Sequence, residues 1–232
     1  MKNKIIKAVI TGDIIHSKRM DNAVLLSLFK SIKDSLKIWD KDFNMISEMF
    51  RGDSFQCFIN TPEEALRIAL IIKTYIRSLN PHEIFDVIKE TDINNKKKMA
   101  YTNWMFDVRI GIGVGEVDLI TNTLANSNGI AFHLSGQALD GLKNSKQHIA
   151  INTIDNYSNE WLTEIVMLDA LISKTSSLQC EVLYLKLLGY TEIQIAQRLN
   201  IGQSAVNQRS VSGNWHAINT MVKRFENVYI NG

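Results

Sequence analysis

Phe50-Arg51-Gly52-Asp53-Ser54-Phe55 decides the fold, because it places a Gly-Asp step between two short apolar runs. Such a step is typical of the tight turn of a β-hairpin. We therefore expect a hairpin over residues 45–59, with the carboxylate of Asp53 at its tip, where it can bind a cation. The same residue types also occur in turns that bind nothing, so Asp53 by itself leaves both interpretations open.

A second carboxylate, Asp13, follows the apolar run of residues 5–10, which predicts a buried strand over residues 4–12. Two aspartates at the ends of neighbouring strands form a minimal Mg²⁺ site, because Mg²⁺ binds one or two carboxylates together with substrate phosphates. The pairing of Asp13 with Asp53 therefore favours a metal-dependent phosphoryl-transfer or nucleotide-binding site over a simple turn.

Helical and strand patterns alternate along the first 152 residues. We expect helices over about residues 20–39, 61–79 and 129–142, and further strands over residues 106–117 and 149–152. Glycine recurs at every second position from 111 to 115, and glycine inside a strand usually marks the close approach of another backbone or a ligand. The order β-α-β-β-α-β-α-β predicts a ferredoxin-like (split βαβ) sandwich with one added helix and strand.

The composition excludes several classes of protein. A chain of 232 residues with 45% hydrophobic and 22% charged residues is globular rather than disordered, and a net charge of +2 does not by itself indicate a polyanionic partner. Cys57 and Cys180 lie in apolar segments, and no apolar run reaches membrane-spanning length. We expect free thiols, no membrane partner and a cytoplasmic location. The lysines at 96–98 are typical of a solvated loop, although such a run beside a nucleotide site can bind phosphate.

The end of the chain predicts an all-α unit. Helices over residues 178–188, 191–199 and from 203 onward are separated by Gly189 and by the turn Asn200-Ile201-Gly202, the pattern of a helix-turn-helix. Arg209 and Lys186 would contact phosphate. The third helix would present side chains that suit base edges or phosphates, namely Gln203, Ser204, Asn207, Gln208 and Arg209. A three-helix bundle used only for packing or dimerisation fits the same pattern.

The first 152 residues resemble a known family. A strand ending in Asp-Ile, a Gly-Asp hairpin, the strand Val-Arg-Ile-Gly-Ile-Gly-Val-Gly-Glu-Val and a Gly-x-x-Phe-x-x-Ser-Gly-x-Ala-Leu helix follow the order of class III nucleotidyl cyclases. The diguanylate-cyclase palm is more distantly similar. The Gly-Asp-Ile-Ile-x-Ser-Lys start at residues 12–18 most closely resembles bacterial SatD-type proteins. The resemblance implies a bound nucleoside triphosphate or other nucleotide, Mg²⁺ with Mn²⁺ as the alternative, and a homodimer.

The resemblance also implies roles for individual residues. Asp13 and Asp53 would be the metal carboxylates, and the Ile14 carbonyl would be a third ligand. His133 and Gln137 fall where the cyclase helix offers an Asn and an Arg to the substrate and its transition state. A glutamine cannot supply the charge that an arginine brings to a transferring phosphoryl group, so the resemblance implies nucleotide binding with little or no cyclisation.

Residues 189–209 resemble the helix-turn-helix of sigma-factor region four and of response regulators, which implies DNA as a partner. The predicted fold class is α+β: a cyclase/palm-type ferredoxin-like sandwich with a C-terminal all-α helix-turn-helix domain. The expected boundaries are residues 1–152, an acidic linker helix at 153–174, and a DNA-binding domain at 175–232. Our leading hypothesis is nucleotide-responsive transcriptional regulation. One alternative is an active nucleotidyl cyclase or related phosphoryl-transfer enzyme with a regulatory tail, and another is a defence or scaffold protein lacking both activities.

Overall fold

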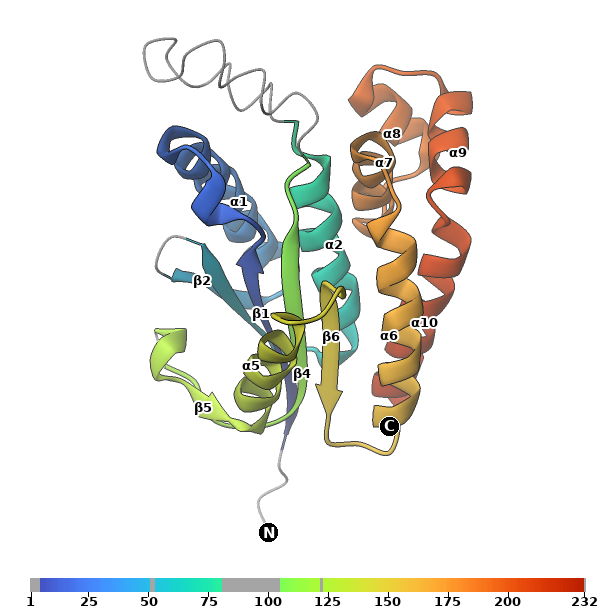
Figure 1. Cartoon of the computed structure of the whole chain (residues 1–232). Helices are drawn as coiled ribbons and strands as arrows, with labels where there is room; N and C mark the ends of the chain where they lie inside the picture. The colour runs from blue at the N-terminus through green and yellow to red at the C-terminus, as the bar shows by residue number, and fades with distance from the viewer. Residues whose placement is uncertain (1–4, 51–52, 81–104, 122, 232) are drawn as a thin grey trace.

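The computed structural model describes residues 5–50, 53–80, 105–121 and 123–231. It is a mixed α+β structure, with a mainly antiparallel sheet covered by helices on both faces and a further group of helices beside it (Figure 1). Two features named above, the turn residues Arg51 and Gly52 and the lysines at 96–98, lie outside the described residues. The rest of the expected β-α-β-β-α-β-α-β order is confirmed.

The sheet has the strand order β2-β3-β1-β4, and β6 pairs with β4 in parallel while β5 pairs with the end of β4. The hairpin prediction is confirmed, because β2 and β3 pair in antiparallel fashion. One boundary was wrong: β1 continues through position 14, so Asp13 lies inside the strand and pairs with both neighbouring strands. The strands are β1 (Ile6–Ile14), β2 (Met45–Phe50), β3 (Ser54–Ile59), β4 (Val108–Leu119), β5 (Asn128–Gly129) and β6 (Ile149–Thr153).

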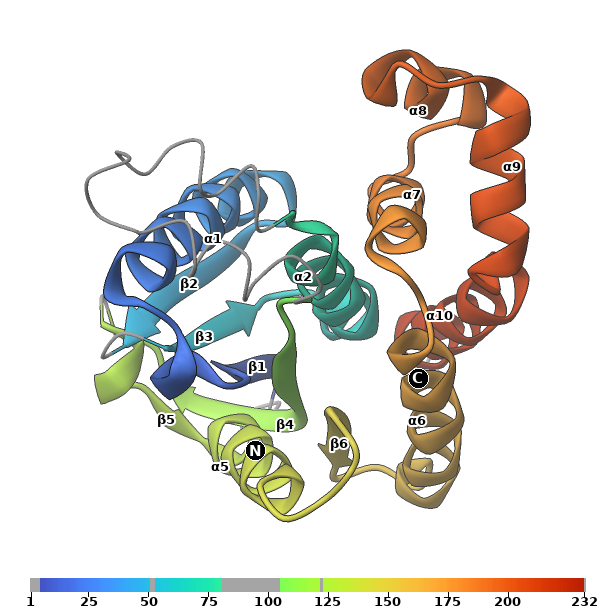
Figure 2. The same ribbon diagram turned by 45° about the horizontal axis from the view of Figure 1, so that its top comes forward.

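Side chains alternate between the two faces of the sheet, as the period of two in a strand requires. Ala8 and Ile10 of β1 pack into a large cluster with helices α1 (Asn22–Asp42) and α2 (Ala65–Ser78), whereas Val9 packs on the other side with residues of α5 (Ile130–Leu142). Figure 2 shows α1 and α2 on one face of the sheet and α5 on the opposite face. Asp13 is four residues from Val9, so it lies on the α5 face.

The alternating glycines of β4 allow α5 to lie directly against the strand. A Cβ atom built on Gly111 would lie 2.4 Å from the Ser135 carbonyl oxygen, and one built on Gly113 would lie 2.2 Å from the Ala131 carbonyl oxygen. Any side chain at these two positions would therefore overlap the helix backbone. The prediction that glycines inside this strand mark a close backbone approach is confirmed, and the backbone is that of α5.

The helices that follow the sheet are α6 (Ser158–Ser173), α7 (Ser177–Leu187), α8 (Glu192–Leu199), α9 (Gln203–Ser212) and α10 (Trp215–Asn231). Of these, α7 and α10 pack against α2, and α6 packs against β6. Trp161 and Ile165 of α6 and Phe225 of α10 belong to the same buried cluster as the strand residues. The predicted linker is therefore helical, but it is a packed element rather than a free spacer, and the division into two domains remains a prediction.

Polar contacts also join α2 to these helices. Arg67 donates to Glu226 of α10 at 2.6 Å and to the Leu187 carbonyl at 3.1 Å. Arg77 donates to the carbonyls of Ser173 and Thr175 at 3.3 and 2.9 Å. Arg77 therefore holds the junction between α6 and α7, and Arg67 joins the end of α7 to α10. In the described part of the chain, no helix is long and apolar enough to cross a membrane.

Candidate functional site

Asp13 and Arg109 form the centre of the candidate site on the α5 face. They are direct cross-strand partners of β1 and β4. Arg109 Nε lies 2.9 Å from Asp13 Oδ1 and Arg109 Nη2 lies 2.8 Å from Asp13 Oδ2, so the guanidinium holds the carboxylate with two parallel hydrogen bonds. Both side chains remain partly exposed, at 18% for Asp13 and 24% for Arg109. The pair is therefore accessible to a ligand.

Asp53 lies beside this pair because of the strand register. Ser54, the next residue, pairs with Asp13, and the Ile14 amide donates to the Asp53 carbonyl at 2.9 Å. The Asp53 carboxylate accepts hydrogen bonds from the Ser17 hydroxyl at 2.8 Å and the Ser54 hydroxyl at 3.3 Å. The two predicted carboxylates thus come from neighbouring strands, as expected. Ser17 is a site residue that the sequence does not predict, although it belongs to the Gly-Asp-Ile-Ile-x-Ser-Lys motif of residues 12–18.

A polar contact fixes α5 to the sheet two residues from Asp13. The hydroxyls of Thr11 and Ser135 are 2.9 Å apart, and Gln56 Nε2 donates to the Thr11 hydroxyl at 3.1 Å. Residues at positions 11 and 13 of one strand point to the same face. This hydrogen-bonded group therefore forms a polar floor next to the ion pair.

His133 and Gln137 are one helical turn apart on α5, and both side chains are solvent-exposed. The buried side of α5 is instead made of small and aliphatic residues, including Ser135 and Ala138. Among the described residues, no hydrogen bond joins His133 or Gln137 to either aspartate. The structure therefore pairs Asp13 with Arg109 and places Asp53 next to the neighbouring strand, where its carboxylate binds Ser17 and Ser54, but it leaves the two α5 residues in solvent.

The oxygen ligands of this site suit a hard cation. Asp13, Asp53 and the Ile14 carbonyl are the ligand types that Mg²⁺ prefers. Both oxygens of Asp13 are held by Arg109, however, so a cation would have to displace or share that guanidinium. Over the described ranges, no cluster of three or more His, Cys, Asp or Glu side chains is placed to hold a metal. A cation here would need phosphate or water oxygens to complete its coordination.

A buried charge network anchors the start of β4, two residues before Arg109. Asp107 pairs with Lys73 at 2.6 Å, with Arg77 at 2.7 Å and with His148 at 3.1 Å. Burial alone would raise the pKa of Asp107, but the His148 hydrogen bond and the charges of Lys73 and Arg77 outweigh it and hold that pKa well below its usual range. The Asp107 carbonyl also accepts from the Ile15 amide at 2.9 Å, which ties β1 to β4 beside Asp13.

The sequence carries a signal for this network in helix α2. Lys73 and Arg77 stand one helical turn apart within the apolar pattern of α2, and both are buried. Charged residues at core positions of a helix need partners, so they indicate a buried ion pair. Burial lowers the pKa of Lys73, although the negative charge of Asp107 opposes that shift.

In the C-terminal helices, α8 and α9 are joined by a short turn. Thr191 and Gln194 form a reciprocal capping box at the start of α8, and Asn200 ends it in the left-handed conformation with φ 52°. On α9, Val206 and Ser210 are buried. The four predicted base-reading residues are exposed on the same helix: Gln203, Ser204, Asn207 and Gln208.

The predicted phosphate contacts are already occupied within the fold. Arg209 is only partly exposed and lies 3.3 Å from Glu181. Lys186 is 11% exposed, donates to Glu192 at 2.8 Å and to Ser210 at 2.9 Å, and lies over the Trp215 ring. The expectation that Lys186 contacts phosphate was therefore wrong, because its ammonium group is enclosed by these partners.

No protein-family model and no curated protein matches the chain. Among solved structures, a bacterial light-regulated adenylyl cyclase is 13% identical, with a TM-score of 0.44 over 63% of this chain and 75% of that one. The dimeric guanylyl cyclase domain of the RhoGC fusion protein from the aquatic fungus Blastocladiella emersonii is 14% identical, with a TM-score of 0.45 over 68% and 83%. The guanylyl cyclase Cya2 is also 14% identical, with a TM-score of 0.40 over 60% and 71%. At these values the similarity assigns neither a family nor an activity to this chain.

Proposed function

We propose that the α5 face of the sheet binds a nucleoside triphosphate together with Mg²⁺ or Mn²⁺. The observation that carries this proposal is the two-point ion pair of Asp13 and Arg109 beside Asp53. Asp13 and Asp53 would hold the cation, which would compete with Arg109 for Asp13, and the freed guanidinium would suit phosphate oxygens through its planar donors. The site thus contains negative charge for the metal and positive charge for the triphosphate. In the free protein the Asp13 carboxylate and the Arg109 guanidinium neutralise each other.

The topology supports a cyclase/palm-type, ferredoxin-like assignment for this unit. The strand order β2-β3-β1-β4, with antiparallel neighbours and with α1 and α2 on one face, is the arrangement of two interleaved split βαβ units. In this arrangement β1 is central, so Asp13 and Arg109 stand on a rigid part of the sheet. A rigid base favours precise placement of a bound cation.

The α5 residues favour nucleotide binding with a low rate of cyclisation. His133 and Gln137 would have to serve where an amide and a guanidinium stabilise the transition state of cyclisation. A neutral glutamine stabilises the developing phosphoryl charge much less than an arginine, a difference worth several powers of ten in rate. The competing hypothesis, an active cyclase or related phosphoryl-transfer enzyme, would require Arg109 to supply that charge.

Thermal unfolding tests the binding proposal. Each of the four nucleoside triphosphates, added with Mn²⁺ or Mg²⁺, is compared with the metal alone. A ligand that binds only the folded state at about 100 times its Kd adds about 2.7 kcal/mol to the unfolding free energy, and thus raises the Tm. We expect this shift for the wild type and for Asp140→Asn, since Asp140 is an exposed α5 residue paired with Lys143. We expect none for Asp53→Asn. An unchanged Tm of the wild type with every triphosphate would refute nucleotide binding.

A turnover assay distinguishes a low rate of cyclisation from full cyclase activity. We expect cyclic-nucleotide production near the detection limit, and no change in the binding shift when Gln137 is replaced by Ala. The informative variant is Gln137→Arg, because it restores the missing positive charge and so tests whether that charge limits cyclisation. Robust production by the wild type that is lost in Asp13→Asn would establish the active-enzyme hypothesis instead.

The exposed polar face of α9 favours a second function, sequence-specific DNA binding. Gln and Asn side chains can form paired hydrogen bonds with adenine in the major groove, and α9 lies at the outer edge of the molecule, far from the sheet (Figure 1). The αL turn at Asn200 sets α9 at an angle to α8, as a helix-turn-helix requires. With nucleotide binding at the other end, such a protein would be a nucleotide-responsive regulator.

Selection of binding sites from random DNA by this chain tests whether it binds DNA sequence-specifically. Asn207→Ala should lower discrimination at one base position by about 1–3 kcal/mol while non-specific affinity stays nearly unchanged. Arg209→Ala should weaken binding to all DNA sequences equally, although the pairing of Arg209 with Glu181 makes this loss of affinity small. Thr220→Ala on α10 is the control and should change neither. If no sequence is enriched at low salt, or if Asn207→Ala enriches the same site equally, α9 does not read bases.

A further inference from the structure

Helix α9 carries one apolar side chain, Val211, in the middle of its exposed polar face. Val211 is 69% exposed, whereas Val206 and Ser210 are the buried residues of this helix. At about 100° per residue, Val211 projects between Asn207 and Gln208, which belong to the preceding turn. It therefore lies on the same face as the residues proposed to read bases.

Neither helix formation nor packing explains a valine at this position. Valine is β-branched and loses side-chain freedom in a helix, so it is not favoured at an exposed helical site. Val211 belongs to none of the hydrophobic clusters formed by the described residues. A single exposed apolar residue is ordinary on a protein surface, but this one lies where the helix would meet the base edges. Its methyl groups are therefore available to a bound DNA.

The exposed face of α9 suits A·T base pairs. In the major groove, Asn and Gln pair with adenine, Arg and Lys pair with guanine, and apolar side chains contact the C5 methyl group of thymine. Over residues 203–212, all of which are described, this face has amide, hydroxyl and apolar groups and no positive charge: Gln203, Ser204, Asn207, Gln208 and Val211. Arg209 projects about 100° further round the helix and is paired with Glu181. The groups that read adenine and thymine are thus present, and the usual guanine reader is turned away.

We propose that Val211 contacts the C5 methyl group of a thymine and that α9 selects an A·T-rich site. This inference rests on the proposed DNA binding and adds the class of base that the helix selects. Asn207 and Val211 are four residues apart, which is about 6 Å along the helix axis. Successive base pairs are about 3.4 Å apart. The thymine should therefore lie about two base pairs from the adenine that Asn207 binds.

Replacing thymine with deoxyuridine tests this contact, because it removes only the C5 methyl group. Sites are first selected from random DNA by this chain, and each thymine of the selected site is then replaced in turn. Burial of one methyl group contributes about 0.8 kcal/mol, which corresponds to an affinity change of about fourfold. We expect the wild type to bind about fourfold more weakly when one particular thymine is replaced. Val211→Ser should bind the thymine and uracil forms of that site equally.

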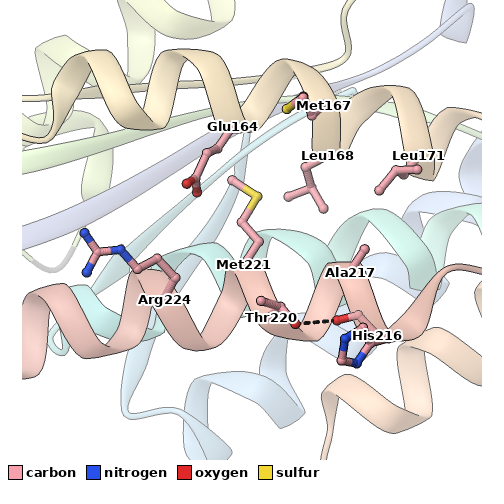
Figure 3. Close-up of a pocket in the computed structure, with 9 residues that line it drawn as sticks. All are labelled: Glu164, Met167, Leu168, Leu171, His216, Ala217, Thr220, Met221 and Arg224. Atoms are coloured by element: carbon pink, nitrogen blue, oxygen red, sulfur yellow. Dashed lines mark hydrogen bonds between the residues drawn. The ribbon is translucent and has the colours of Figure 1, made fainter.

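Two features of the variants make this comparison clean. Serine and valine have similar helix propensities, so Val211→Ser should leave α9 folded with unchanged circular dichroism. Met167→Ser is the matched control, because Met167 is 65% exposed on α6, beside the groove between α6 and α10, rather than on α9 (Figure 3). This control should retain the fourfold preference of the wild type for thymine.

The outcomes separate this inference from the DNA-binding proposal. If no sequence is enriched, α9 does not bind DNA specifically and both proposals are wrong. If a sequence is enriched but uracil weakens the binding of wild type and Val211→Ser equally, DNA binding stands and the role of Val211 is refuted. An enriched site that contains no A·T pairs, or that tolerates uracil at every thymine, would refute it as well.

Discussion

Replacing Gly113 with alanine tests the strand–helix contact on which the candidate site rests. The new Cβ would lie 2.2 Å from the Ala131 carbonyl oxygen and 2.4 Å from the Ser135 amide nitrogen. Ordinary contact begins at 3.4 Å, so α5 would have to move by about 1 Å, and both obstacles are backbone atoms that no rotamer change can remove. A gap of 0.5–1 Å forfeits about a quarter to a half of the dispersion energy at each contact that opens.

We therefore expect Gly113→Ala to lower the unfolding free energy by about 2–3 kcal/mol, the upper part of the range for overpacked cores. For a chain of this size that is a fall in Tm of about 4–12 °C. Gly136→Ala is the matched control in α5, because a Cβ there meets nothing within 4 Å. It should stabilise the protein by about 0.5–1 kcal/mol, since alanine is the better helix former. If Gly113→Ala unfolds at the wild-type urea concentration, the close packing of α5 on β4 is wrong.

Two further predictions concern the stability of the whole chain. The pKa of Asp107 is depressed in the folded state, so its ionised form stabilises the fold above the unfolded value of about 4, and this stabilisation is lost as the pH falls through the folded pKa. Wild-type urea midpoints should therefore fall more steeply between pH 5 and pH 3 than those of Asp107→Asn, and parallel slopes would exclude this residue as the cause. Thr191→Ala should lower the unfolding free energy by about 1 kcal/mol by removing the α8 cap, whereas the exposed mid-helix Thr163→Ala should change it by less than about 0.5 kcal/mol; equal losses in urea titrations of the two variants would show that the cap is not responsible.

Much of the fold followed from local patterns. The apolar runs around Asp53 gave the hairpin, and the alternating glycines of β4 gave the close approach of a backbone, because both signals depend on neighbouring residues only. The strand limit was placed before Asp13, since a Gly-Asp step usually ends a strand, but pairing with β3 and β4 carries β1 through Gly12 and Asp13 to the buried Ile14. Partners far apart in sequence can prolong a strand that local propensity would end.

The candidate site was predictable in its residues but not in their pairing. Asp13 and Asp53 were both named from the sequence, yet the Asp13–Arg109 ion pair depends on the cross-strand register of segments 96 residues apart. Ser17 was missed because a hydroxyl next to a turn is too common to indicate a ligand. Lys186 was placed wrongly, since its enclosure by Glu192 and Trp215 arises only when α7, α8 and α10 meet.

The burial of α2 between the sheet and the C-terminal helices has a consequence for synthesis on the ribosome. The side of α2 that faces these helices gains its packing partners only when residues 158–231 have been made, and Arg67 on that side then meets Glu226. At translation rates of about 5–20 residues per second, this takes about 4–15 s after α6 begins to be made. During that interval the nascent chain exposes an apolar helix on which Arg67 lacks its carboxylate partner, whereas Arg77 can already pair with Asp107. Nascent chains that stall before α6 should therefore bind chaperones or aggregate, even though every strand of the sheet has already been translated.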